Sequence, residues 1–223
     1  MADWNTLFTD EAHIKRAPEG AFYKWTSTVE SLHPERPIRA WDLCCGAGRH
    51  TVAMARRGWD VHASDISETG ITEARAWLDR WELDAHLAVA DMTEMPWPER
   101  SFHAVISWDS IHHNTVANIR TAVANVYEHL VPGGLFIGTI KSDKAFSADR
   151  GREIEPGTRI KDVGSDAGVI HHYFGEDELR QLFRDFEYIA LAEKVMDYKE
   201  YDRQLNPFGF TTWAFCLRRP TRS

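Results

Sequence analysis

The stretch IRAWDLCCGAGRHTVAMARRGWDVHASDI, residues 38–66, decides the fold of this chain. Ile38 to Cys44 is a short, unbroken apolar run, which is typical of a buried strand. Gly46-Ala47-Gly48 follows as a turn, and a helix-compatible segment then ends at Gly58. Val61 to Ile66 is again short and apolar, and predicts a second strand. Strand, glycine turn, helix and strand make one unit in which the two strands run parallel.

The same alternation of strands and helices continues along the chain. Because both faces of a parallel sheet need covering helices, the sequence predicts an α/β protein. The tail ends in two strands in quick succession, which predicts a terminal hairpin. Further strands are predicted at 86–90, 104–108, 135–140, 188–195 and 212–217, and the last two follow a helix expected to reach Phe186.

The composition predicts one soluble, cytoplasmic domain over 1–223. The chain has 223 residues, 26 Lys plus Arg against 34 Asp plus Glu, and a net charge of −8, which makes nucleic acid an improbable partner. Three cysteines, two of them adjacent, offer no disulfide framework and point to a reducing compartment. No stretch is long and apolar enough to be a signal peptide or to span a membrane.

Two segments lie outside the alternation. Residues 1–37 contain an apolar helical pattern and are expected to form an N-terminal helical cover, with a plain core helix as the alternative. Residues 142–170 are polar, contain glycine and have little periodicity, and are longer than a loop in a compact domain usually is. We expect them to form an insertion or lid near the site of a second ligand.

Acidic residues stand where the predicted strands end. They are Asp42, Asp65, Asp91 and Asp109, and ligands of open parallel sheets bind beyond the carboxyl ends of the strands. Asp65 comes 17 residues after Gly48, where a carboxylate can accept both hydroxyls of a ribose. A nucleoside ligand is therefore expected.

A dinucleotide cofactor is one alternative. Its glycine pattern would place a third Gly where this chain has Thr51, and the chain contains no Tyr-x-x-x-Lys pair. An NAD-dependent oxidoreductase is therefore a weaker interpretation. The motifs of hydrolase nucleophile elbows and of phosphate-binding loops do not occur either.

Five motifs in order resemble those of class I S-adenosylmethionine-dependent methyltransferases. The resemblance runs from Trp41 to Lys141, and the His171-His172-Tyr173-Phe174 stretch is similar to the tellurite-resistance-like branch that acts on small molecules. The five motifs are Asp42-Leu43-Cys44-Cys45-Gly46-Ala47-Gly48-Arg49-His50, Ser64-Asp65-Ile66-Ser67, Ala90-Asp91-Met92, Phe102-His103-Ala104-Val105-Ile106 with Ser107-Trp108-Asp109, and Leu130-Val131-Pro132-Gly133-Gly134-Leu135.

The resemblance implies a seven-stranded sheet of order 3-2-1-4-5-7-6, with the last strand antiparallel. It also implies roles for single residues: Gly46 and Gly48 pass the methionyl part of S-adenosylmethionine, and Asp65 holds its ribose. Cys44 departs from the pattern, since many members have Gly there. The remaining residues implied to bind the cofactor are Asp42, Arg49, Ile66, Asp91, Met92 and Trp108, with Asp109 beside Trp108 at the reaction centre.

Each acidic or basic residue also has a purely structural alternative. Asp65 could cap the helix that begins near Ser67, and Asp91 could make a local Asx-turn. Asp42 could serve mainly to fix the glycine turn, and Arg49 could be solvated.

Catalysis by such an enzyme rests on alignment, because the methyl group of a sulfonium is already activated. Where the acceptor must lose a proton, the candidate bases are Asp109, His112 and His172. Adjacent histidines without spaced partners are not a metal-ligand pattern, so no metal is expected. Substitution of Asp65 is expected to weaken cofactor binding and to leave the fold intact.

The sequence thus predicts transfer of a methyl group from S-adenosylmethionine to a small-molecule acceptor, by a monomer or homodimer. One alternative is a non-catalytic module that binds S-adenosylmethionine or S-adenosylhomocysteine. Only product formation separates that module from an enzyme.

Overall fold

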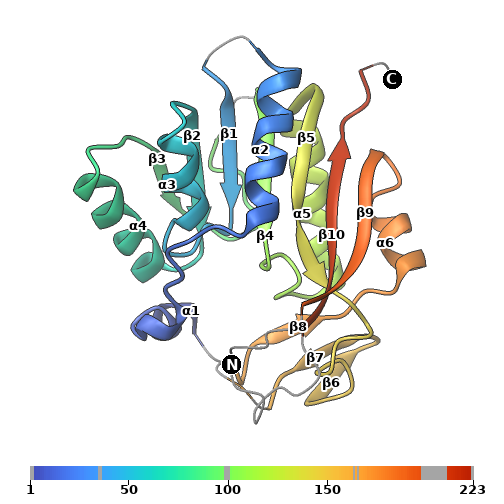
Figure 1. Cartoon of the computed structure of the whole chain (residues 1–223). Helices are drawn as coiled ribbons and strands as arrows, with labels where there is room; N and C mark the ends of the chain where they lie inside the picture. Colours follow the sequence, from blue (N-terminus) through green and yellow to red (C-terminus); the bar gives the residue numbers. More distant parts are fainter. Residues whose placement is uncertain are drawn as a thin grey trace.

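A seven-stranded sheet forms the centre of the computed structural model, which describes residues 3–34, 37–97, 101–162, 164, 166–196 and 210–221 (Figure 1). The strand order is β3-β2-β1-β4-β5-β10-β9. Neighbouring strands from β3 to β5 pair in parallel, and β10 pairs antiparallel with both β5 and β9. The strands are β1 Arg39–Leu43, β2 Asp60–Asp65, β3 His86–Val89, β4 Phe102–Trp108, β5 Leu130–Lys141, β9 Glu187–Met196 and β10 Phe210–Arg218.

This topology confirms the predicted fold class and the terminal hairpin. Taken in chain order, the seven strands of the sheet stand as 3-2-1-4-5-7-6. The labels run to ten because three strands of the insertion form a sheet of their own. The last strand is antiparallel to its neighbour β5, as expected.

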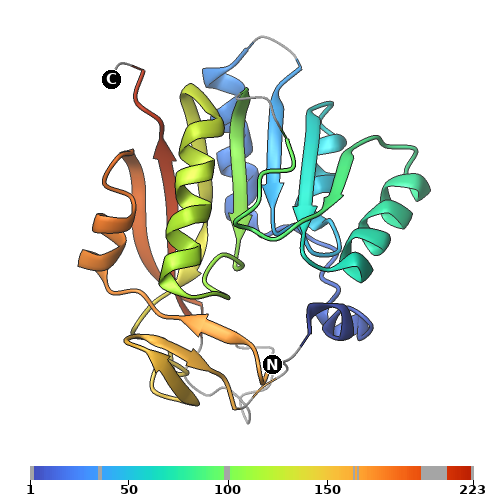
Figure 2. The same ribbon diagram turned by 180° about the vertical axis from the view of Figure 1, so that it is seen from behind.

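Helices cover both faces of the sheet and create two apolar cores. Figure 2 shows α5 and α6 on one face, and Figure 1 shows α2 and α3 on the other. Phe22 of α2 and Val52 of α3 belong to one core, and Ile119 of α5 and Leu179 of α6 to the second. The helices are α1 Trp4–Leu7, α2 Gly20–Leu32, α3 Arg49–Ala55, α4 Glu68–Arg80, α5 Val116–His129 and α6 Glu176–Leu182, with a short 3-10 helix at Glu11–His13.

The N-terminal segment divides into two parts. Helix α2 buries Phe22, Thr26 and Val29 against the sheet, so it is a core helix. Only the short helix α1 lies near the carboxyl ends of the parallel strands, beside α4 (Figure 1). The cover expected over 1–37 stays a prediction, and within the described residues only the segment around α1 is placed to form one.

The insertion forms a small antiparallel sheet. Strands β6 Arg152–Glu155, β7 Thr158–Ile160 and β8 Ile170–His172 pair in the order β6-β7-β8, and residues 163 and 165 lie outside the described residues. The sheet lies beyond the carboxyl ends of β4 and β5 (Figure 1). In the described part of the chain, no helix is long and apolar enough to cross a bilayer.

Candidate functional site

The glycine turn after β1 depends on backbone conformations that favour glycine. Gly46 and Gly48 have φ angles of 54° and 84°. A Cβ added at Gly48 would lie 2.7 Å from the Cβ of Ala74, so the turn packs directly against α4. Cys44 adopts a φ of 59° without being glycine, which is a strained conformation at the position where the resemblance leads one to expect Gly.

Asp65 fastens this turn to the end of β2. Its Oδ2 accepts a hydrogen bond of 2.8 Å from the backbone N–H of Gly46, and its Oδ1 accepts one of 2.8 Å from that of Ser67. Burial raises the pKa of Asp65, and the hydrogen bonds from Ser67 and Gly46 oppose that rise. The neighbouring Ile66 is 51% exposed, although it is a large apolar residue. Ser67 itself caps α4, because its Oγ accepts from the backbone N–H of Gly70 at 3.0 Å.

Asp42 lies in the interior beneath the same turn. Its Oδ2 accepts a hydrogen bond of 2.6 Å from the hydroxyl of Thr51, the residue that replaces the third Gly of dinucleotide sites. Burial raises the pKa of Asp42 to about 6, and the Thr51 hydrogen bond offsets part of that rise. Asp42 thus contacts the first helix of the unit. Arg49 begins that helix and is half-buried.

Asp91 and Met92 follow β3. Oδ1 of Asp91 accepts hydrogen bonds from the backbone N–H and the hydroxyl of Thr93, at 2.8 and 2.6 Å, which is the Asx-turn geometry. Met92 is buried in the core that α5 and α6 share.

The loop after β4 contains the charged part of the site. Trp108 is buried at the end of the strand, and Asp109 follows with a φ of 54°, its N–H donating to Oγ1 of Thr139 at 2.9 Å. The Asp109 carboxylate lies 3.1 Å from Nζ of Lys141 and 3.8 Å from Nε2 of His112. Burial alone would raise the pKa of Asp109, but Lys141 and the neighbouring histidine hold it well below the usual value. Asp109 is therefore a carboxylate throughout the neutral range.

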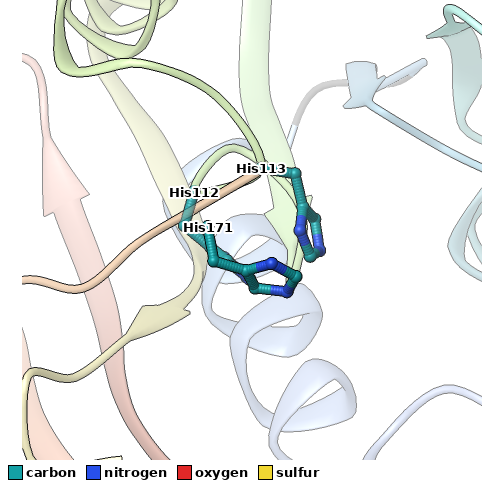
Figure 3. Close-up of side chains that lie close together, drawn as sticks. All are labelled: His112, His113 and His171. Carbon is teal, nitrogen blue, oxygen red and sulfur yellow. The ribbon is translucent and has the colours of Figure 1, made fainter. Parts of the chain in front are cut away.

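Three histidines converge just beyond this loop (Figure 3). The ring centroids of His112 and His113 are 4.1 Å apart, and those of His113 and His171 are 4.3 Å apart. His112 and His171 are fully buried. Burial lowers the pKa of His112 well below its usual value, and burial followed by the effect of His171 lowers that of His113 to about 3. The rings of His112 and His113 are therefore neutral at pH 7.

The structure brings His171, and not the sequence-predicted His172, to this cluster. Successive residues of a strand point to opposite faces, and His172 faces the other side of β8. There its Nδ1 lies 2.7 Å from the Thr158 hydroxyl, and its Nε2 lies 3.2 Å from Glu178. The backbone N–H of His172 donates to the carbonyl oxygen of His112 at 2.8 Å, which fixes β8 against the loop after β4.

Helix α1 approaches the site from the opposite side. Oδ1 of Asn5 accepts from the hydroxyl of Ser67 at 3.0 Å and from the N–H of Thr69 at 3.2 Å. The ring centroids of Trp4 and His113 are 5.0 Å apart. A Cβ added at Gly46 would lie 2.8 Å from the ring of Phe8. The segment around α1 therefore touches both the glycine turn and the histidines.

Sequence reasoning did not select Lys141, His113 or His171 as site residues. Lys141 ends β5, so the rule that ligands meet the carboxyl ends of strands could have found it. His113 was visible as a neighbour of His112. The choice between His171 and His172 required the register of β8.

The segment that contains the glycine turn and β4 matches a known protein family. Residues 40–134 match the family model described as a methyltransferase domain. A protein of Bacillus subtilis named "Putative methyltransferase YqeM" is 27% identical over 202 residues, which cover 84% of this chain and 78% of that protein. A sugar-nucleotide N,N-dimethyltransferase of Streptomyces venezuelae is 34% identical over 98 residues, 43% of this chain and 39% of that enzyme.

Solved structures show the same fold. TehB from Haemophilus influenzae has a TM-score of 0.71 at 17% identity, over 98% of this chain and 68% of that one. A 1,6-didemethyltoxoflavin-N1-methyltransferase from Burkholderia thailandensis, solved with its substrate and S-adenosylhomocysteine, has a TM-score of 0.63 at 20% identity, over 91% of this chain and 79% of that one.

Proposed function

Because the chain belongs to the class I S-adenosylmethionine-dependent methyltransferases, we propose that it transfers the methyl group of that cofactor to a small molecule. The acceptor would lie between the segment around α1 and the insertion 142–170. Methyl transfer and the cofactor follow from the family, whereas the size of the acceptor and the residue roles below are our proposal.

The observation that supports a small acceptor is that two flanking segments meet over the loop after β4. The ring centroid of Trp4 in α1 lies 5.0 Å from that of His113, and the ring centroid of His171 in β8 lies 4.3 Å from it. Contacts from both sides place side chains of two flanking segments beside this loop, and a site bordered in this way suits a ligand that can be surrounded. The net charge of −8 also disfavours RNA as the acceptor.

For the cofactor we propose the binding mode implied by the motifs. The methionyl part lies along the backbone of Gly46 and Gly48, near Arg49, and Asp42 supports the turn. Each Asp65 oxygen accepts one backbone N–H and keeps a second lone pair, so the ribose hydroxyls can still bind there. The exposed side chain of Ile66 then covers one face of the adenine, near Asp91 and Met92, while Trp108 lies at the methyl end.

At the acceptor end, Asp109 and His112 are the proposed catalytic residues. Asp109 remains anionic and can orient a hydroxyl or amine, and the neutral His112 can accept a proton. Holding both reactants in line contributes ~7 to 11 kcal/mol, more than the ~3 to 5 kcal/mol of a general base. We assign His172 a positioning role through Thr158 and Glu178, in place of direct proton transfer.

The proposal is tested by S-adenosylhomocysteine release with a panel of small phenols, amines, thiols and oxyanions, against transfer RNA and a denatured protein mixture. Turnover with a member of the small-molecule panel is expected. Turnover with RNA or protein alone would overturn the proposal.

Cofactor occupancy is checked independently by thermal unfolding with S-adenosylmethionine, S-adenosylhomocysteine and NAD. Ligand at about 100 times its Kd stabilises by about 2.7 kcal/mol, which is a rise in Tm of about 5 to 11 °C for a chain of this size. We expect that rise with the first two compounds and no rise with NAD.

A further inference from the structure

We infer that the rings of His112, His113 and His171 form a binding site for a divalent transition metal ion of the zinc class, beside the proposed reaction centre. One nitrogen from each ring lies within 4.8 Å of the other two (Figure 3). Imidazole nitrogen is among the commonest ligands of such ions, and three histidines with one open position are a typical zinc site.

Unpartnered ring atoms are the observation that points to a ligand. His112 is fully buried, yet among the described residues neither of its ring nitrogens has a hydrogen-bond partner, and Nδ1 of His113 also lacks one. Leaving buried polar atoms without partners destabilises a folded protein. A metal ion would accept the lone pair of one nitrogen from each ring and so provide a partner for it.

The geometry needs only a small adjustment to hold an ion. Zinc–nitrogen bonds of about 2.0 to 2.1 Å in a tetrahedron separate the nitrogens by about 3.3 Å. The three ring centroids already lie 4.1 to 5.6 Å from one another, and rotations about the side-chain bonds would close the remaining distance between the nitrogens. Although His112 and His113 are adjacent, the turn closed by the His113 N–H and the Ser110 carbonyl oxygen, 2.9 Å apart, brings both rings to one side.

An outer shell for this site is present as well. Oδ2 of Asp166 lies 2.9 Å from Nε2 of His171, and Lys161 pairs with the same carboxylate. A carboxylate on the outer nitrogen is the usual device that fixes the tautomer and orientation of a metal-binding histidine. Nδ1 of His171 would then be the ligating atom, and it would give up its 3.3 Å contact with the carbonyl oxygen of Val169 to bind the ion.

The open position suggests a role, which rests on the proposed function. With the ion bound, His112 is a ligand, and the ion replaces it as the group that helps the acceptor to lose its proton. An acceptor X–H that binds the ion through X loses its proton to water, and X⁻ then attacks the methyl carbon as the carbon–sulfur bond breaks. The sulfonium becomes a neutral thioether. Metal coordination would thus supply an ionised nucleophile near neutral pH.

A second cluster in the chain provides the contrast. Asp60, His62 and His86 also offer atoms within 4.8 Å of one another. There Nε of Arg39 donates to Nε2 of His62 at 3.1 Å, and the guanidinium lies 3.4 Å from Asp60. A fixed cation already uses these groups, so we use His86, whose side chain is 63% exposed, as the control position.

The test is a calorimetric titration of metal-free protein with Zn²⁺, repeated with Co²⁺ by visible absorption, without cofactor or acceptor. We expect one equivalent to bind. His171→Ala and His113→Gln should weaken binding at least a hundredfold, and Asp166→Asn by about 10- to 100-fold. His86→Ala should leave the affinity within twofold of the wild type.

Circular dichroism of each metal-free variant establishes that it is folded. If His171→Ala does not fold, the variants His113→Gln and Asp166→Asn test the site instead, because both residues are only half-buried. Absence of binding to the wild type, an unchanged affinity in His113→Gln, or loss of binding in His86→Ala would each overturn the metal site. The titration contains no cofactor, so absence of Zn²⁺ binding would not contradict methyl transfer. Zn²⁺ binding without turnover would instead contradict the proposed function.

Discussion

Asp65 accepts a hydrogen bond from the backbone N–H of Gly46, with 2.8 Å between the nitrogen and Oδ2. The carboxylate predicted to hold the ribose therefore also holds the glycine turn in place. Sequence reasoning expects a substitution at Asp65 to affect only the cofactor. The structure adds a second effect, because the backbone N–H groups of Gly46 and Ser67 would both lose their acceptor.

We predict that Asp65→Ala both weakens S-adenosylmethionine binding and lowers the stability of the cofactor-free protein. Loss of a hydrogen bond to a charged group costs about 1.5 to 3 kcal/mol, which is about 10- to 150-fold in Kd. Calorimetry with the cofactor and urea unfolding without it measure the two effects. Asp65→Asn keeps one acceptor oxygen and should recover part of the stability. An unchanged Kd in Asp65→Ala would remove the ribose assignment.

Gly48 and Gly58 form a matched pair for testing the turn. Both have positive φ, at 84° and 74°, but a Cβ at Gly48 meets Ala74 at 2.7 Å, whereas one at Gly58 meets nothing within 4 Å. Gly58→Ala should therefore cost about 1 to 2 kcal/mol for the backbone alone. Gly48→Ala should cost about 1 to 3 kcal/mol more because of the overpacking. Equal unfolding free energies would show that α4 moves away at little cost.

Glu155 joins the insertion to the main domain. Its Oε1 accepts from the N–H of Val116 at 2.8 Å, at the start of α5, and from the hydroxyl of Thr158 at 2.9 Å. Thr115, the residue that precedes α5, makes no side-chain cap of its own. Glu155→Ala removes this cap and should cost about 1 kcal/mol, or about 2 to 4 °C in Tm.

The same substitution should raise the KM of the acceptor more than that of S-adenosylmethionine, because it loosens the insertion and not the glycine turn. Glu153→Ala is the control, since Glu153 pairs with Arg159 within the insertion. Equal changes in both variants would mean that the contact with α5 is unimportant.

The free energy of unfolding should depend on pH because of Asp42. Its pKa is raised from the ordinary 3.8 to about 6, so between these values the folded protein keeps a proton that the unfolded chain has released. Ionisation of Asp42 thus lowers the stability of the fold as the pH rises through this window. The shift corresponds to about 3 kcal/mol.

Asp42→Asn removes the ionisation and keeps an acceptor for Thr51. The free energy of unfolding of this variant, relative to the wild type, should therefore increase by about 2 kcal/mol between about pH 4 and pH 7.5. Urea unfolding at both pH values measures it. The same difference at the two pH values would contradict the raised pKa.

Most of the large sheet could be predicted because its strands are continuous apolar runs that end at recognisable turns. The strands of the insertion could not. β6 reads Arg152-Glu153-Ile154-Glu155 and is largely exposed, so neither periodicity nor hydrophobicity marks it. The helix expected to reach Phe186 ends at Leu182, although Phe183 and Phe186 still pack in the core. These two buried rings continue the apolar spacing of a helix in the sequence, although the helix has ended before them.

The candidate site divides in the same way. Residues within the motifs, such as Asp65 and Ile66, could be proposed because the motifs resemble those of the family, and their roles stay predictions. His171 could not be distinguished from His172, since a three-residue strand has no alternation from which to read its inward face. The partnership of Lys141 with Asp109 joins two strands that only the folded sheet brings together.

The dependence of α1 on Asn5 has a consequence for the local stability of this segment. A helix of four residues does not persist in water without docking, so α1 is a helix because Asn5, Trp4 and Phe8 hold it against the domain. Asn5→Ala removes the acceptor of Ser67 and Thr69 and should therefore loosen the segment that contacts both the glycine turn and His113. Faster hydrogen exchange of the α1 amides in that variant would measure the effect.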